Sequence, residues 1–200
     1  MVMELPVDLT PELAPLYWLI GEWEGTGRLG TGEADDASFF QKITFKDPGL
    51  PFLEYRAESW LLNEEDGQLL RPLSTEVGFW ALDRALQDGD VGPGMTPADV
   101  VPVYRSAEDV ERLRNKDDAF DITATIAHPG GITELYYGAI KGPQVQIVTD
   151  SVMRGEHAKE YSGGTRMYGL VNNDLYWRWD MQTADGATPH ASGILKKKVS

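Results

Sequence analysis

Much of the chain alternates hydrophobic and polar residues in short runs, which is the pattern of half-buried β-strands. In residues 120–126, Phe, Ile and Ala alternate with Asp and Thr, and residues 175–182 alternate Leu, Trp and Met with charged or polar neighbours. A first strand is expected from residue 21. Aromatic and β-branched residues predict nine more strands, at 38–45, 51–62, 74–82, 119–127, 132–140, 144–152, 165–171, 174–183 and 191–198.

The gaps between these runs are mostly short and turn-like, as in "DPGLP", "EEDGQ", "HPGG", "IKGP" and "VNND". Short connections join neighbouring antiparallel strands, and the spacing leaves no room for βαβ units. About ten such strands predict an all-β, antiparallel up-and-down barrel. A barrel of this size can enclose one small ligand.

One segment before the strands has a different pattern. The stretch "TPELAPLYWLIG" predicts a short N-terminal helix that Thr10 caps, with Pro11 at its first position and Gly21 at its end. A single apolar helix ahead of a strand-rich chain suits a plug or a lid. Residues 1–9 are expected to be a flexible tail, and residues 10–200 a single barrel domain.

A second segment, at about 83–118, interrupts the strand rhythm and is rich in Gly, Pro and charge. It is interpreted as an inserted loop, with a short helix in "SAEDVERLRN". A loop of this length is either functional or mobile. It could cover the mouth of the barrel or bind a partner protein.

The composition and charge of the chain disfavour or exclude several classes of function. The net charge of −14 disfavours nucleic acid and anionic membranes, because an acidic surface repels phosphates. The absence of cysteine excludes disulfides, thiolate catalysis and cysteine-based metal sites. No basic, apolar leader opens the chain, and no apolar run is long enough to span a bilayer, so a cytoplasmic location is expected.

The spacing Gly25-x-Gly27-x-x-Gly30 matches the dinucleotide-binding fingerprint. A true fingerprint follows a strand and opens a helix, whereas here a helical pattern precedes the glycines. Asp35 and Asp36 follow them and would repel a pyrophosphate. We interpret the glycines as part of a first strand that bends or lets another backbone approach closely.

The chain has three histidines, and no two of them have the close helical spacing of a zinc site. His128 begins the turn "HPGG" and is interpreted as a turn residue, and His157 as a solvated loop residue. His190 stands just before the last predicted strand. By spacing alone it is either a packed side chain or a ligand. A single histidine is enough only for a cofactor that brings its other ligands, as heme does.

Several stretches, taken together and in order, resemble the nitrobindin family of heme-binding β-barrels. The segment "LIGEWEGTG" carries the GxWxGxG signature of that family. It is followed by "PFLEY", "EVGFW", "HPGGITELYYG", "AKEY" with Arg166, "DLYWRWDMQ" and "PHASGIL". The resemblance covers roughly residues 12–198, with the segment 83–118 as an interruption.

The resemblance implies a ten-stranded barrel of the lipocalin and fatty-acid-binding-protein shape, with one heme b per chain near one open end. It implies that His190 is the axial iron ligand and catalytic residue, and that Lys159 binds a heme propionate. Such proteins bind nitric oxide and isomerise peroxynitrite to nitrate, and many are homodimers. The expected function is therefore that of a peroxynitrite isomerase.

The chain departs from the family pattern at three places. Thr31-Gly32-Glu33 replaces the family's "YPT", which puts Glu33 beside the heme; Ser74 replaces a distal histidine; and Ala191 replaces the leucine after the axial histidine. A glutamate is a poor neighbour for propionates. These changes leave an alternative open, in which the same barrel holds no heme and binds a fatty acid or another small apolar ligand.

Overall fold

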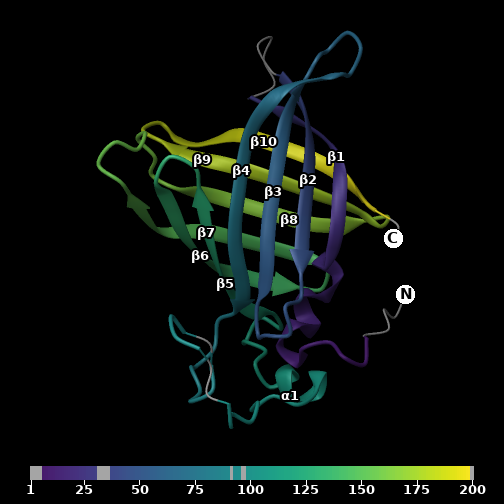
Figure 1. The fold of residues 1–200 in the computed structure, drawn as a ribbon, viewed down its shortest axis with the longest axis vertical. Helices are drawn as coiled ribbons and strands as arrows, with labels where there is room; N and C mark the ends of the chain where they lie inside the picture. Colours follow the sequence, from purple (N-terminus) through teal and green to yellow (C-terminus); the bar gives the residue numbers. More distant parts are fainter. Residues whose placement is uncertain (1–5, 31–36, 91, 96–97, 199–200) are drawn as a thin grey trace.

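The computed structural model describes residues 6–30, 37–90, 92–95 and 98–198, and shows a closed antiparallel barrel (Figure 1). Each strand pairs with its neighbours in sequence, and β1 pairs with β10 to close the barrel. The predicted ten-stranded fold is confirmed. The strands are β1 Gly21–Leu29, β2 Ala37–Lys46, β3 Leu53–Leu62, β4 Leu69–Leu82, β5 Phe120–His128, β6 Ile132–Lys141, β7 Gln144–Arg154, β8 Gly164–Val171, β9 Asp174–Thr183 and β10 Gly186–Lys197.

The last strand begins earlier than the sequence pattern predicted. β10 starts at Gly186, so His190 lies inside a strand and not before one. The first half of β10, "GATPH", has no apolar alternation and includes Pro189, which is a strong signal against a strand. Backbone pairing with β9, from Gly186 opposite Thr183 onward, nevertheless places these residues in the sheet.

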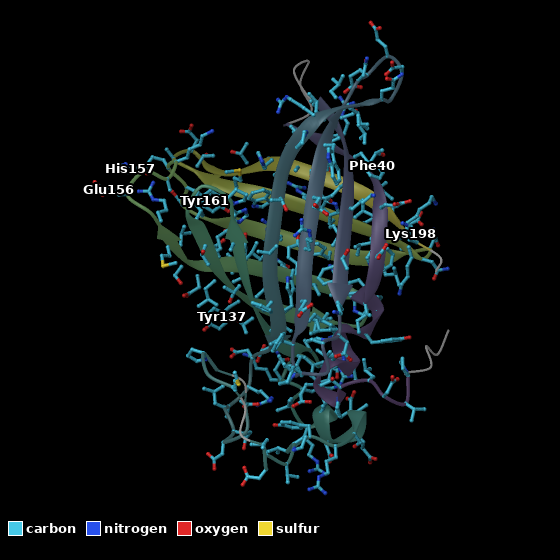
Figure 2. The ribbon with its side chains drawn as sticks, in the orientation of Figure 1. Phe40, Tyr137, Glu156, His157, Tyr161 and Lys198 are labelled. Atoms are coloured by element: carbon cyan, nitrogen blue, oxygen red, sulfur yellow. The ribbon has the colours of Figure 1, made fainter. Side chains whose placement is uncertain are left out.

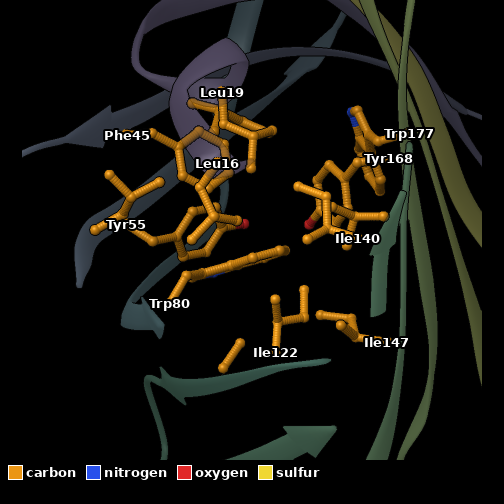
Figure 3. Close-up of a cluster of buried hydrophobic side chains, with 14 of the residues drawn as sticks. Leu16, Leu19, Phe45, Tyr55, Trp80, Ile122, Ile140, Ile147, Tyr168 and Trp177 are labelled. Atoms are coloured by element: carbon orange, nitrogen blue, oxygen red, sulfur yellow. The ribbon is translucent and has the colours of Figure 1, made fainter. Parts of the chain in front are cut away.

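The predicted helix is a 3-10 helix, η1 (Pro11–Leu19), with Pro11 at its start as expected. The predicted cap is wrong, because the Thr10 side chain makes no capping bond and instead donates to Asp47 Oδ1 at 3.1 Å. Leu13, Leu16 and Leu19 are fully buried. Figure 3 shows Leu16 and Leu19 packed among the aromatic side chains of the barrel interior, so η1 closes one end of the barrel.

The glycines of β1 serve strand packing. A Cβ on Gly25 would lie 2.2 Å from the carbonyl oxygen of Ile194 on β10, and one on Gly27 would lie 2.3 Å from that of Ser192. The close backbone approach predicted from the sequence is confirmed. Trp23 is buried between these strands and η1, and its Nε1 donates to the Leu19 carbonyl at 2.7 Å.

The connection between β4 and β5 lies at the η1 end of the barrel (Figure 1). Its helix α1 (Ala107–Glu111) is shorter than the segment predicted, and it packs on η1 with Val110 buried. Arg84 anchors the connection by donating to Glu12 at 3.1 Å and to Asp90 at 2.7 Å. β1 runs from η1 to the opposite end of the barrel. The described part of the connection therefore does not cover the end where His190 lies.

Candidate functional site

His190 lies at a β-bulge in the pairing of β10 with β9. Pro189 pairs with Asp180 on β9. The next pair is Ala191 with Trp179, so His190 between them has no partner on β9. Because Ala191 is buried inside the barrel, strict alternation would turn the histidine outward. The bulge inserts one extra residue and re-aims its side chain toward the interior.

The ring of His190 packs against Trp179. The two ring centroids are 4.8 Å apart, and the planes are nearly perpendicular at 82°. The backbone carbonyl of His190 accepts a hydrogen bond from Gly30 N at 3.0 Å, which ties the bulge to the end of β1. The imidazole itself makes no hydrogen bond to any side chain or backbone group that the structure describes.

The surroundings keep the imidazole neutral. Burial lowers the pKa of His190, the positive charge of Arg166 lowers it further, and Glu76 opposes both effects. The net result is a pKa below the ordinary value for histidine, so the ring is uncharged at neutral pH. A neutral imidazole has the free lone pair that a metal ion requires.

Arg166 is the charged centre of the barrel interior, and its side chain is only 1% exposed. Its Nη1 donates to Glu76 Oε2 at 2.7 Å, and its Nε donates to the Tyr136 hydroxyl at 3.0 Å. The guanidinium carbon lies 4.3 Å from the ring of Trp179, which is opposite Arg166 in the register of β8 and β9. The indole of Trp179 thus contacts both the Arg166 cation and the edge-on ring of His190.

Glu134 is a second buried carboxylate, with no exposed surface on its side chain. It bonds His128 Nε2 at 2.8 Å and accepts from Thr149 at 2.8 Å and Tyr161 at 2.7 Å. Burial alone would raise the pKa of Glu134. The hydrogen bond to His128 and the charge of Arg166 outweigh burial, so the pKa is lowered and the group is ionised.

His128 was interpreted as a turn residue, and that interpretation is wrong. It is the last residue of β5, and its ring is stacked on Trp179 with 6.2 Å between centroids and 18° between planes. The sequence feature that could have indicated the pairing of His128 with Glu134 is the hairpin "HPGGITE". Ile126 pairs with Glu134, so His128 and Glu134 are diagonal neighbours on one face of the hairpin.

The connection between β7 and β8 carries two residues singled out in the sequence. His157 is exposed, as expected, and lies near the tip of the connection (Figure 2). Lys159 is also exposed, and its backbone carbonyl accepts from Arg154 at 3.3 Å. Tyr161, for which the sequence pattern contains no signal of a site role, turns inward to Glu134 and packs edge-on against Trp179, with 6.3 Å between the ring centroids.

Glu33 and Ser74 are the two remaining positions at which the chain was expected to differ from the family near the heme. Glu33 lies outside the described residues. Ser74 is on the same side of β4 as the inward-facing Glu76, two positions away, yet it is exposed. Ser74 therefore faces the open end of the barrel and not its packed interior.

The donor set fits a heme. The described residues contain no cluster of three or more His, Asp or Glu that could hold a bare metal ion. They do contain one inward, neutral histidine without a hydrogen bond, beside aromatic side chains. A metal that arrives with ligands of its own needs only this one protein ligand.

Comparison with known proteins gives the family. Residues 12–197 match the family described as THAP4-like, heme-binding beta-barrel domain. The chain belongs to this family. Heme is therefore the cofactor expected of this barrel, and the resemblance to nitrobindins seen in the sequence motifs is confirmed.

Relatives of the family match over nearly the whole chain. A protein of Renibacterium salmoninarum named peroxynitrite isomerase is 64% identical, and the alignment covers 100% of this chain and 95% of that protein. Proteins with the same name from an Arthrobacter species and from Micrococcus luteus are 59% and 62% identical, with 98% and 100% of this chain covered and 99% and 89% of theirs.

A solved structure has the same fold. The crystal structure of Rv2717c from M. tuberculosis superposes with a TM-score of 0.67, covering 96% of this chain and 100% of that one, at 22% sequence identity. In the part of the chain that the structure describes, no helix is long and apolar enough to cross a membrane.

Proposed function

We propose that this barrel binds one heme b through His190 and isomerises peroxynitrite to nitrate, and that it also binds nitric oxide. The observation that carries the proposal is the inward, neutral His190 imidazole on the bulge of β10. Relatives at 64% and 59% identity that are named peroxynitrite isomerase support the choice of reaction.

When bound, heme supplies a Lewis-acidic iron with an open position, at which peroxynitrite can rearrange to nitrate with no net oxidation or reduction. The residues of the chain would hold the heme and shield the site from bulk water. His190 offers its lone pair, and burial together with the positive charge of Arg166 lowers the pKa of the ring and keeps that lone pair free of a proton. The aromatic side chains of Trp179 and Trp177 would exclude bulk water from the surroundings of His190.

Lys159 is proposed as a cofactor-binding residue, and so is Glu33, which lies outside the described residues. The exposed Lys159 belongs to the connection that also brings Tyr161 to the site, so its ammonium can reach a propionate as a point charge. Glu33 brings a like charge to the propionates, which weakens heme binding relative to a threonine there.

The alternative of a heme-free barrel for a fatty acid is less well supported. The family is one of heme-binding barrels, and relatives of high identity are named for an isomerase.

The test is a hemin titration of the purified chain followed by absorbance. The wild type is expected to give a Soret band that saturates at one hemin per chain, and His190→Ala is expected to abolish it. His157→Ala is the matched control, because His157 is exposed on a loop. An unchanged spectrum in His190→Ala would reject the ligand. Peroxynitrite decay to nitrate, measured with and without hemin, then tests the reaction.

A cytoplasmic location and a homodimer stay predictions. Sedimentation of the chain with and without hemin measures its oligomeric state. Fractionation of the cells that produce it measures its location.

A further inference from the structure

Trp179 lies against His190 and against three other side chains of the site. Its ring lies 4.8 Å from that of His190, 6.2 Å from that of His128 and 6.3 Å from that of Tyr161. The Arg166 guanidinium carbon is 4.3 Å from it. These partners come from β5, β8, β10 and the connection between β7 and β8, so one side chain joins four segments of the barrel.

A histidine that binds a metal is usually oriented by a hydrogen bond from its second ring nitrogen to a carboxylate, a carbonyl or water. Among the described residues, His190 has no such bond. The bulge also releases it from the regular ladder with β9. Contact with a neighbouring ring also restrains the orientation of an imidazole, and Trp179 packs against the ring of His190.

We propose that Trp179 is the positioning residue of the heme site, holding the His190 ring in the orientation that presents its nitrogen to iron. The proposal rests on the proposed function, and it assigns to an aromatic contact the task that a hydrogen-bond acceptor performs elsewhere. Trp179 itself does not touch the reacting atoms.

Trp179 can perform this task because it is itself held in place. Its cation partner Arg166 is fixed by Glu76 and by the Tyr136 hydroxyl. Its ring partners His128 and Tyr161 are both fixed by hydrogen bonds to Glu134. The two buried carboxylates thus set the position of the indole.

The packing around the indole is tight on the side of β8. A Cβ on Gly164 would lie 2.8 Å from Trp179 Nε1. The indole therefore packs directly on the backbone of β8 at Gly164.

The experiment compares Trp179→Ala and Trp179→Phe with the matched control Trp60→Phe. Trp60 is also half-buried, but it packs on Phe40 and does not contact the site. Each protein is titrated with hemin, its ferric form is examined by electron paramagnetic resonance, and the melting temperature of its apo form is recorded.

In Trp179→Ala, hemin affinity is expected to fall by about 10-fold, the lower end of the effect of removing groups that orient metal ligands. Its ferric signal is expected to broaden, because the ring samples several orientations. Trp179→Phe should recover most of both properties, because a phenyl ring can also pack edge-on. Trp60→Phe should match the wild type. Wild-type affinity and line shape in Trp179→Ala would overturn the proposal.

A second measurement uses the unmutated apo protein, so it does not depend on whether the Trp179 variants fold. With isotope-labelled histidine, nuclear Overhauser effects from the His190 ring to the Trp179 indole should show one ring orientation. Several orientations, or no contact, would overturn the proposal. Failure of the wild type to bind hemin would instead reject the proposed function and leave this contact as measured.

Discussion

Arg166 and Glu76 are ninety positions apart in sequence and form an ion pair inside the barrel, with 2.7 Å between Nη1 and Oε2. Both side chains are less than a tenth exposed. The pair connects β8 to β4 across the interior and places a positive charge beneath Trp179 and near His190. Several consequences can be measured.

Replacing Glu76 by Gln leaves a buried guanidinium without its counter-charge. Breaking one side of a buried ion pair typically costs about 3–5 kcal/mol, so the free energy of unfolding in urea should fall by about that amount. The control is Glu58→Gln, because Glu58 pairs with Arg56 on the exposed surface at 2.8 Å. That change should cost less than about 1 kcal/mol. Equal losses in the two variants would contradict the role of burial.

Stability should depend on Glu134 at acid pH. Its folded pKa is lowered, so the unfolded chain takes up a proton first as the pH falls. The contribution of Glu134 is complete above the unfolded value of about 4.3 and is lost as the pH falls through the lower folded value. Urea unfolding of the apo protein between pH 7 and pH 3 measures this slope.

In Glu134→Gln the slope over that pH window should be shallower, because the group no longer titrates. Its stability at pH 7 should already be reduced, since His128 then faces an uncharged amide in place of the carboxylate. An unchanged slope would show that folding does not lower the pKa of Glu134.

The affinity for hemin should be unchanged in mildly acidic solution. Protonation of His190 competes with iron, and its pKa lies below the ordinary value of about 6.5. We expect the hemin dissociation constant to stay level from pH 8 through pH 6.5 and to rise only below that point. A rise centred at pH 6.5 or higher, in hemin titrations across this range, would mean that burial and Arg166 do not act on the imidazole.

The pairing of β1 with β10, which closes the barrel, should be weakened by substitution of Gly25 with alanine. An alanine methyl there would meet the Ile194 carbonyl oxygen at 2.2 Å, so β1 and β10 must separate. The expected cost is about 1–3 kcal/mol of unfolding free energy, as for other overpacked positions. Gly94→Ala is the control, because a Cβ there meets nothing within 4 Å. Thermal or urea unfolding of the two variants should separate them clearly.

Local sequence pattern predicted most of the barrel. The strand 174–183 has the bounds that alternation indicated, and the segments from 120 to 154 differ by two residues or fewer. The pattern failed for β10, where Pro189 and small polar residues conceal a strand that exists because β9 lies beside it. Alternation of hydrophobic and polar residues indicates a strand with one buried face. It gives no signal for a strand segment that is exposed on both faces.

The candidate site was only partly predictable. The position of His190 followed from the family resemblance, whereas its inward direction depends on a bulge, which is a property of two strands in register. His128 was missed because a histidine before "PGG" is typical of a turn, and its partner Glu134 is defined only once the hairpin forms.

By itself, the sequence determined the strand order, the antiparallel barrel and the presence of very few histidines. Each of these depends on neighbouring residues or on composition. Only the tertiary structure decided that Arg166 meets Glu76, that Glu134 holds His128 and Tyr161, and that Trp179 packs on His190. The physical reason is that closing the barrel buries groups from distant strands together. A buried charge is stable only when it is paired and hydrogen-bonded, and the partners available to it lie on other strands across the interior and not next to it in the sequence.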